Sequence, residues 1–279
     1  MSDDTLQGRF VWYELLTSDP DAATGFYTEL IGWGTAEWGE GENPYVMWTT
    51  DGTPEGSMGG VIPLPEEARK AGAPPHWLPY VGSSDIEATV SEAQKLGGKV
   101  LVALTEIPTV GRFAVLSDPQ EAVFAVFAPA EQAPGHEGPA QLMEFSWHEL
   151  ATTDHQAAFE FYDGLFGWKK TESFDMGPAG IYQMYGRKDM TLGGMFNKFE
   201  DMPGPPAWLL YIEVEDVDQA AERVQELGGK VLNGPMEVPG GGRIAQCMDP
   251  QGAAFAMHTS SVQTADGYQP SAEIQNSKS

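Results

Sequence analysis

FSWHELATTDHQAAFEFYDGLFGW, the stretch from Phe145 to Trp168, decides the fold because it repeats FVWYELLTSDPDAATGFYTELIGW, the stretch from Phe10 to Trp33. Of the 24 aligned positions, 13 are identical. Further matches follow each copy at similar spacing, with Leu-Gly-Gly-Lys-Val at 96–100 and 227–231 and Asp-Pro-Gln at 118–120 and 249–251. Internal repeats of this kind define domain organisation. The chain therefore consists of two copies of one module.

Each module is predicted to alternate strands and helices in a fixed order. Residues 10–16 are aromatic and branched, which favours a strand, and Thr17 to Asp19 is typical of a helix N-cap. Apolar residues at helical spacing then continue to Leu30, and Gly32 ends the helix. The later elements of the first copy are predicted at 34–38, 45–50, 59–62, 77–81, 88–96, 99–104, 112–116 and 122–127. We therefore expect an α+β fold of four β-α-β-β-β units, paired within the modules.

The repeat also predicts the domain boundaries. The first module spans 9–128 and the second spans 144–260. The segment between them, 129–143, is rich in Ala, Pro and Gly, which is typical of a linker. Residues 261–279 are polar and are expected to form a flexible tail.

Composition excludes several classes of function. Asp and Glu number 41 against 15 Lys and Arg, which gives a formal net charge of −26. Such a surface repels phosphate backbones and anionic lipids, so we expect neither nucleic acid nor a membrane as partner. The single cysteine, Cys247, cannot form an intrachain disulfide, and no apolar run is long enough to cross a bilayer. We predict a soluble, cytoplasmic protein.

The repeated pattern resembles a known superfamily. Each module has a helix of the form D-x-x-x-A-x-x-F-Y that ends in L-x-G-W, and an Asp-Pro-Gln turn before its last strand. This pattern resembles the vicinal oxygen chelate superfamily, which includes glyoxalase I, the extradiol dioxygenases and the fosfomycin and bleomycin resistance proteins. It is similar to bacterial tandem glyoxalase-like proteins that are often labelled hydroxylases. The resemblance implies paired units whose sheets curl into open barrels around a cavity.

The same resemblance implies a divalent metal, such as Mn, Fe, Ni or Zn, held by His, Gln or Glu on three strands. The three positions match Trp12, Leu78 and Ala125 in the first module and Trp147, Leu209 and Ala256 in the second. None of these side chains can bind a metal. We therefore expect no metal and no other cofactor; the alternative is a divalent metal held by displaced ligands.

Strand alternation places two carboxylates on the face that carries these positions. Glu14 and Glu149 lie two residues beyond Trp12 and Trp147, so each Trp-Glu pair shares a face. A buried carboxylate with a raised pKa is a candidate general base. The other reading, which the residue type favours, is a structural role in which backbone amides or an arginine hold the carboxylate.

His258 distinguishes the second module. Its counterpart in the first module is Phe127, and strand parity places it on the same face as Ala256. By the same parity, Tyr80 and Tyr211 lie on the face of the implied metal positions. His258 and Glu149 could form a carboxylate–imidazole pair suited to proton transfer. An ordinary histidine at a strand end is the alternative.

The last turn of the first module is also expected to differ. Glu121 replaces Gly252 at a place that often needs a positive φ, so a distorted first-module turn is predicted.

Arginines and tryptophans complete the candidate site. Arg112 and Arg243 begin equivalent strands, where they could clamp a substrate carboxylate or phosphonate, or neutralise Glu14 and Glu149. Indole rings would suit a flat or apolar ligand, although they are equally common in simple cores. The candidate aromatic lining consists of Trp12, Trp77, Trp147 and Trp208.

Three functional hypotheses remain open. The first is a protein that binds a small, aromatic or anionic molecule without the usual metal. The second is an enzyme, either a cofactor-free isomerase, epimerase or lyase that uses Glu149 and His258, or a metal-dependent glyoxalase or dioxygenase. The third is a structural role with a filled cavity. Because a tandem chain can supply a dimer's pairing internally, we expect a monomer, with a homodimer as the alternative.

Overall fold

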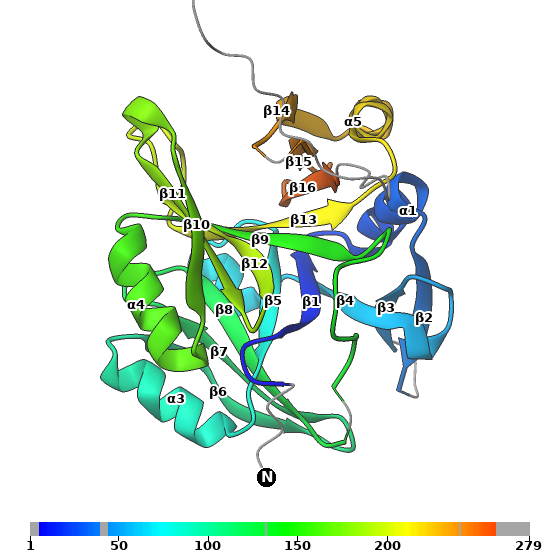
Figure 1. Ribbon diagram of the computed structural model, residues 1–279. Coiled ribbons are helices and arrows are strands. Elements are labelled where there is room, and N and C mark those ends of the chain that lie inside the picture. Colours follow the sequence, from blue (N-terminus) through cyan, green and yellow to red (C-terminus); the bar gives the residue numbers. More distant parts are fainter. Residues whose placement is uncertain (1–5, 40–43, 132, 240, 261–279) are drawn as a thin grey trace, which may run out of the picture.

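Two open eight-stranded sheets form the framework of the protein (Figure 1). The computed structural model describes residues 6–39, 44–131, 133–239 and 241–260. The strand orders are β2-β3-β4-β1-β5-β8-β7-β6 and β10-β11-β12-β9-β13-β16-β15-β14, so the two sheets have the same topology. The predicted α+β fold of four β-α-β-β-β units is confirmed, and the sheets are open rather than closed barrels.

The strands and the long helices follow one another in the same order in both modules, and the short helix α2 has no counterpart in the described part of the second. The first contains β1 (Phe10–Thr17), α1 (Pro20–Ile31), β2 (Gly34–Trp38), β3 (Tyr45–Thr49), β4 (Ser57–Pro63), α2 (Glu66–Lys70), β5 (His76–Gly82), α3 (Ile86–Lys95), β6 (Lys99–Ile107), β7 (Gly111–Ser117) and β8 (Val123–Pro129). The second contains β9 (Phe145–Thr152), α4 (His155–Phe166), β10 (Lys169–Asp175), β11 (Ile181–Arg187), β12 (Met190–Asn197), β13 (Ala207–Glu213), α5 (Val217–Glu226), β14 (Lys230–Glu237), β15 (Arg243–Met248) and β16 (Ala254–Thr259).

The repeated stretch forms the strand, cap and helix that its sequence predicts. Asp19 accepts a hydrogen bond of 3.0 Å from the backbone amide of Ala22, and Asp154 caps α4 in the same way. Gly32 and Gly167 end the two helices with φ angles of 90° and 73°. These angles lie in the left-handed region, where glycine carries no Cβ penalty.

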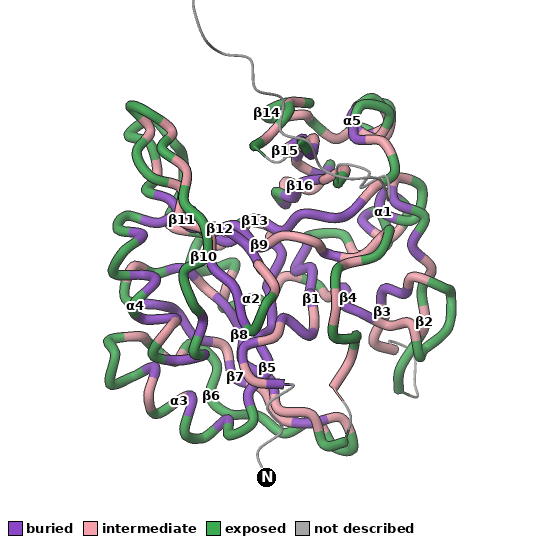
Figure 2. Tube along the Cα trace, viewed as in Figure 1, coloured by how far each residue is buried: buried purple, intermediate pink, exposed green. Residues whose placement is uncertain are grey.

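The two modules share one hydrophobic core between their sheets. Helix α1 of the first module lies beside α5 of the second, and α3 lies beside α4 (Figure 1). The larger cluster of buried apolar side chains draws on both modules. In Figure 2 the buried residues follow the central strands, whereas the strand tips are exposed. We call the face of each sheet that is turned away from the helices its outer face.

Aromatic side chains join the modules along an approximate twofold relation. The ring of Phe10 stacks on His148 with centroids 3.6 Å apart, and the ring of Tyr13 stacks on Phe145 at 4.0 Å. The Tyr13 hydroxyl lies 2.7 Å from Nε2 of His148. His148 therefore lies at the junction of the two modules.

A second pair of contacts anchors each first helix to the other module. Tyr27 on α1 donates a 3.2 Å hydrogen bond to Asp249, and Tyr162 on α4 donates one of 3.2 Å to Asp118. Both aspartates belong to the repeated Asp-Pro-Gln turn. This repeated motif therefore links the modules as well as turning the chain.

The two Asp-Pro-Gln turns have the same shape, so the predicted distortion of the first is wrong. Glu121 adopts a φ of 78° where Gly252 has 103°. Asp118 accepts a hydrogen bond of 2.9 Å from the Ala122 amide, which reproduces the corresponding bond in the second turn. These bonds hold the turn even though a left-handed conformation is unfavourable for glutamate.

Two further expectations concern the membrane and the chain end. Within the described ranges, no helix is both long and apolar enough to cross a membrane. The predicted flexible tail, 261–279, lies outside the described residues.

Candidate functional site

The first sheet carries a carboxylate network on its outer face. Glu14 on β1 is 9% exposed. Its Oε1 accepts a 2.8 Å hydrogen bond from the Tyr45 hydroxyl, and its Oε2 accepts one of 2.8 Å from Tyr80. The indole nitrogen of Trp12 donates to the Tyr45 hydroxyl at 3.1 Å. Both carboxylate oxygens are therefore satisfied by phenols.

The second sheet repeats this network with one addition. Glu149 accepts hydrogen bonds from Tyr182 at 2.9 Å and from Tyr211 at 3.1 Å, and Trp147 donates to Tyr182 at 2.8 Å. Gln246 on β15 adds an amide that donates to the Tyr211 hydroxyl at 2.9 Å and to Glu149 at 3.3 Å.

Glycines make room for the tyrosines. Gly60 is the strand partner of Glu14 on β4, and Gly194 holds the equivalent place on β12. A Cβ on Gly60 would come within 2.0 Å of the Tyr45 hydroxyl. Glycine at these positions therefore leaves room for each tyrosine to extend over the neighbouring strand and reach the carboxylate.

Burial sets the protonation behaviour of the network. It raises the pKa of Glu14 and of Glu149, and the tyrosine hydrogen bonds oppose that rise. The pKa of Tyr80 and of Tyr211 is also raised, first by burial and then by the carboxylate beside each ring. The tyrosines thus keep their protons and act as donors.

Strand parity predicted part of this network. The shared face of Trp12 and Glu14 is confirmed, as is that of Trp147 and Glu149, and both strand-paired tyrosines lie on it. The prediction missed Tyr45 and Tyr182, which reach in from β3 and β11. Their equivalent places in Tyr-Val-Met-Trp (45–48) and Tyr-Gln-Met-Tyr (182–185) were the available signal.

The positions where the resemblance implies metal ligands lie within this network. Tyr80 pairs with both Trp12 and Ala125, and Leu78 pairs with Glu14. One carboxylate surrounded by phenols and apolar side chains is a poor donor set for a divalent cation. Across the part of the chain that the structure describes, no group of three or more His, Cys, Asp or Glu could hold a metal ion.

Trp77 and Trp208 do not line the outer faces, which corrects their predicted role. Each directly precedes the residue at the implied metal position of its strand, Leu78 or Leu209. Because successive side chains alternate, each tryptophan points to the opposite side, toward the helices. Trp77 donates a 3.0 Å hydrogen bond to Tyr27, and Trp208 packs edge-on against Tyr162 at 5.3 Å. Both belong to the shared core.

The arginines are also engaged elsewhere. Arg112 forms an ion pair with Glu87 in the first turn of α3. Arg243 makes hydrogen bonds of 2.7 and 2.9 Å to Asp218 in the first turn of α5. These arginines therefore pair with carboxylates at helix starts and do not neutralise the buried glutamates, which corrects that alternative.

His258 does not pair with Glu149, which corrects a third prediction. On β16 its strand partner is Glu213, whereas Ala256 is the residue beside Tyr211. Nδ1 of His258 lies 3.0 Å from Oε2 of Glu213. Residues two apart on a strand are roughly 6–7 Å apart, so parity gave the correct face but not the correct neighbour.

A β-bulge brings one more polar group to the outer face. The pairing of β9 with β13 shifts where Phe145 and Trp147 oppose the consecutive residues Ile212 and Tyr211. Ser146 is the extra residue, and its hydroxyl oxygen lies 3.3 Å from Nδ1 of His258. Strand alternation alone could not predict this placement.

The outer faces of the two modules differ in the side chains that cover them. On the first, a second apolar cluster forms around Leu78, Tyr80 and Phe127, and Leu6 of the N-terminal segment joins it. No such cluster covers the described part of the second outer face. Four positions there are polar in the second module and apolar or glycine in the first. Ser146 corresponds to Val11, Glu213 to Gly82, Gln246 to Val115, and His258 to Phe127.

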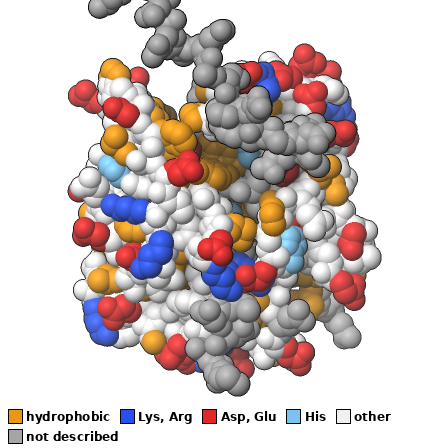
Figure 3. Space-filling model, in the orientation of Figure 1, with side chains coloured by type: hydrophobic (Ala, Val, Ile, Leu, Met, Phe, Trp, Pro, Cys, Tyr) orange, Lys and Arg blue, Asp and Glu red, His pale blue; other side chains and the backbone are white. Residues whose placement is uncertain are grey.

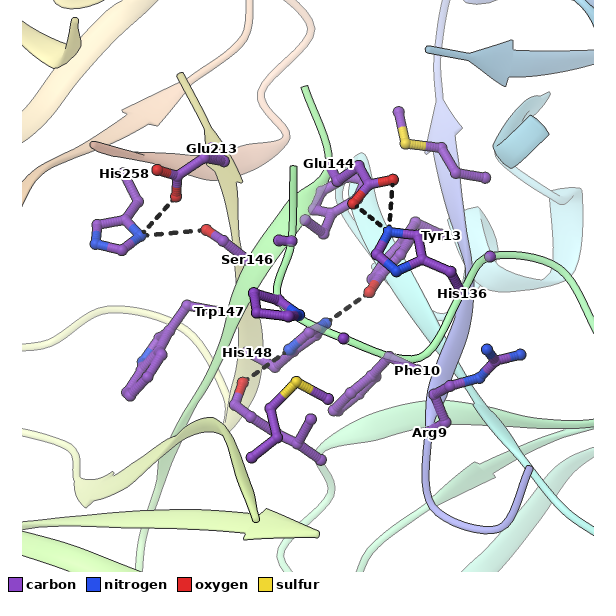
Figure 4. Close-up of a pocket in the computed structure, with 18 of the residues that line it drawn as sticks. Arg9, Phe10, Tyr13, His136, Glu144, Ser146, Trp147, His148, Glu213 and His258 are labelled. Carbon is purple, nitrogen blue, oxygen red and sulfur yellow. Dashed lines mark hydrogen bonds and ion pairs between the residues drawn. The ribbon is translucent and has the colours of Figure 1, made fainter. Parts of the chain in front are cut away.

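An open cleft adjoins the second outer face. A cavity of about 330 Å³ between the modules reaches from Arg9 and His136 to Trp147 and His258. Figure 4 shows Trp147 and His258 at one end of it and Glu144 and His136 at the other. In Figure 3 the surface is hollowed between β10–β12 and β14–β16, with hydrophobic side chains gathered in the hollow.

Comparison with known proteins identifies the family. A sequence model of the Glyoxalase/Bleomycin resistance protein/Dioxygenase superfamily matches residues 9–126 and 144–257. The chain belongs to this superfamily. The resemblance inferred from the sequence is thereby confirmed.

Individual proteins similar to this chain extend the comparison. The chain is 32% identical over 262 residues to "Putative glyoxylase CFP32" of Mycobacterium tuberculosis, covering 90% of this chain and 94% of that protein. It is 29% identical over 270 residues to the anthracycline biosynthesis protein DnrV of Streptomyces peucetius, covering 94% and 95%. The Mn(II)-bound glyoxalase from Novosphingobium aromaticivorans is a structural neighbour with a TM-score of 0.59 and 18% identity, covering 91% of this chain and 82% of that one. This last likeness concerns the fold alone.

Proposed function

We propose that the protein binds a small, flat aromatic molecule on the outer face of its second module, without a divalent metal in the superfamily's usual position. The observation that carries this proposal is the difference between the two outer faces. Both contain the network of one tryptophan and two tyrosines around the buried glutamate, which we call the Trp-Tyr-Glu-Tyr network. Among the described residues, only the first outer face is covered by an apolar cluster. Polar groups and the partly buried indole of Trp147, which no such cluster packs against in the described residues, remain available on the second.

The side chains around this site indicate the chemistry of the ligand. Trp147 offers an aromatic surface, and Gln246 and the tyrosines offer hydrogen bonds close to it. An anionic ligand fits less well, because both oxygens of Glu149 lie there and Arg243 is bound to Asp218. The name of DnrV, an anthracycline biosynthesis protein, supports an aromatic ligand.

Proton transfer by Glu149 is the second candidate function. Burial raises the pKa of this carboxyl, which suits a general acid or base, and one relative is named a glyoxylase. A substrate would have to displace Tyr182 or Tyr211 from the carboxylate. A Glu149→Gln variant that binds substrate normally but loses turnover would establish this role.

We also infer that the protein acts as a cytoplasmic monomer. The stacking of Phe10 on His148 and of Tyr13 on Phe145 supports a monomer, because it pairs the modules within one chain.

Replacing Trp147 with alanine is expected to weaken aromatic binding at least about tenfold, because the ligand would lose its stacking surface. We would titrate the full chain with 1-naphthol by calorimetry. Trp12→Ala is the matched control, since Trp12 makes the same hydrogen bond in the covered module. Equal losses in the two variants would contradict the assignment to the second module.

A further inference from the structure

Three polar side chains meet at the end of the cleft beside Trp147. They are Ser146 on β9, Glu213 on β13 and His258 on β16, and all three line the cleft. Figure 4 shows Ser146 and Glu213 both directed toward the imidazole ring. The Trp-Tyr-Glu-Tyr network uses other residues. It therefore does not explain why Ser146 and Glu213 contact His258.

The contacts within this cluster determine which imidazole nitrogen carries hydrogen. Glu213 Oε1 accepts a 2.9 Å hydrogen bond from the Ser260 amide, and Oε2 lies 3.0 Å from Nδ1 of His258. Burial raises the pKa of Glu213, but the neighbouring His258 and the hydrogen bond from the Ser260 amide outweigh this effect and leave the pKa below its usual range. The carboxylate is therefore ionised and can only accept.

The serine agrees with this assignment. Its hydroxyl donates to the backbone oxygen of Tyr211 at 3.4 Å, which leaves the Ser146 oxygen as an acceptor toward Nδ1. We assign the hydrogen to Nδ1 of His258 because the Ser146 oxygen that it contacts is an acceptor and the Glu213 carboxylate lies 3.0 Å away, although that second contact lacks the alignment of a hydrogen bond. In the neutral ring, Nε2 is then an acceptor.

Nε2 is the atom that the cluster leaves unused. It has no hydrogen-bond partner among residues 6–39, 44–131, 133–239 and 241–260, and the side chain of His258 is 21% exposed. Gly242 lies beside it, and a Cβ at that position would come within 2.8 Å of Nε2. Glycine there keeps the space next to Nε2 open.

We propose that Nε2 of His258 accepts a hydrogen bond from a hydroxyl group of the ligand, so that the protein selects hydroxylated aromatics, such as phenols, over their ethers. This inference rests on the proposed function and deepens it by naming the ligand class. Trp147 and His258 line the same cleft, so one small aromatic can contact both. In the first module Phe127 replaces the histidine, and an accepting group is missing at that place.

The test compares two probes of similar shape, 1-naphthol and 1-methoxynaphthalene, of which only the first can donate. We expect the full chain to bind 1-naphthol about tenfold more tightly by calorimetry. His258→Phe, which copies the first module, should bind both probes equally at the affinity that the wild type shows for the ether. Gly242→Ala, which keeps the histidine and fills the space beside Nε2, should reduce the preference in the same way.

His76→Phe is the matched control, because His76 lies on β5 away from the cleft and should leave the preference unchanged. Unchanged ether binding in the variants shows that they are folded. Wild-type protein that binds both probes equally, or a preference that survives in His258→Phe, would overturn the inference and leave the proposed function standing. Wild-type protein that binds neither probe would overturn both.

Discussion

Trp168→Ala is expected to lower the free energy of unfolding by about 3–5 kcal/mol, because it removes a large ring from a core that cannot refill the space. The Trp168 side chain is fully buried and stacks on Tyr185 with centroids 4.6 Å apart. Its indole nitrogen donates a 2.8 Å hydrogen bond to the backbone oxygen of Gly8, which lies immediately before the other module. The substitution should therefore weaken module packing as well as the second module itself.

Chemical denaturation of the full chain measures this effect. Because the core is shared, we expect a single transition that shifts as a whole. Trp38→Ala is the control, since Trp38 is 43% exposed and its loss should change stability by no more than about 0.5 kcal/mol. A loss below about 1 kcal/mol in Trp168→Ala, or a separate unchanged transition for the first module, would contradict a shared core.

Acid is expected to destabilise the protein by about 3 kcal/mol through His148 alone. Burial lowers the pKa of His148 from 6.5 to about 4, against a weaker upward influence of its hydrogen bond to Leu192. Between these values the unfolded chain binds the proton and the folded chain does not. Stability from the neutral ring is thus complete above about pH 6.5 and is lost as the pH falls toward 4.

The measurement compares wild type with His148→Gln, which does not titrate, from pH 7 to pH 4. The difference is needed because buried acids with raised pKa, including Glu14, Glu149, Asp118 and Asp249, change stability in the opposite direction over part of this range. We expect the free energy of unfolding of wild type to fall more steeply, by about 3 kcal/mol in total. Parallel pH profiles would show that His148 is not held neutral between the modules.

The sequence predicts the fold well because its signals are local and occur twice. Asp19 and Gly32 mark the helix ends in one copy, and Asp154 and Gly167 do so in the other. Those residues act through their own backbone neighbours, so spacing is enough to recognise them. The packing of α1 on α5 across the modules depends on distant contacts, and no local pattern encodes it.

The candidate site is only partly predictable for a related reason. Alternation identifies the face of Glu149, since the period of a strand is regular. It cannot find Tyr182, which comes from another strand, nor Ser146, which a bulge turns to the outer face. It also cannot choose between Glu149 and Glu213 as the partner of His258, because that choice depends on strand register.

Calorimetric titration of the chelator-treated full chain with 1-naphthol, before and after adding Mn²⁺, Fe²⁺, Ni²⁺ or Zn²⁺, tests the central claim most directly. We predict binding that is lost in Trp147→Ala, retained in Trp12→Ala, and unchanged within about twofold by each metal, because Trp147, Leu209 and Ala256 cannot act as ligands. Binding that requires a restored metal, with stoichiometric uptake by the protein, would contradict it.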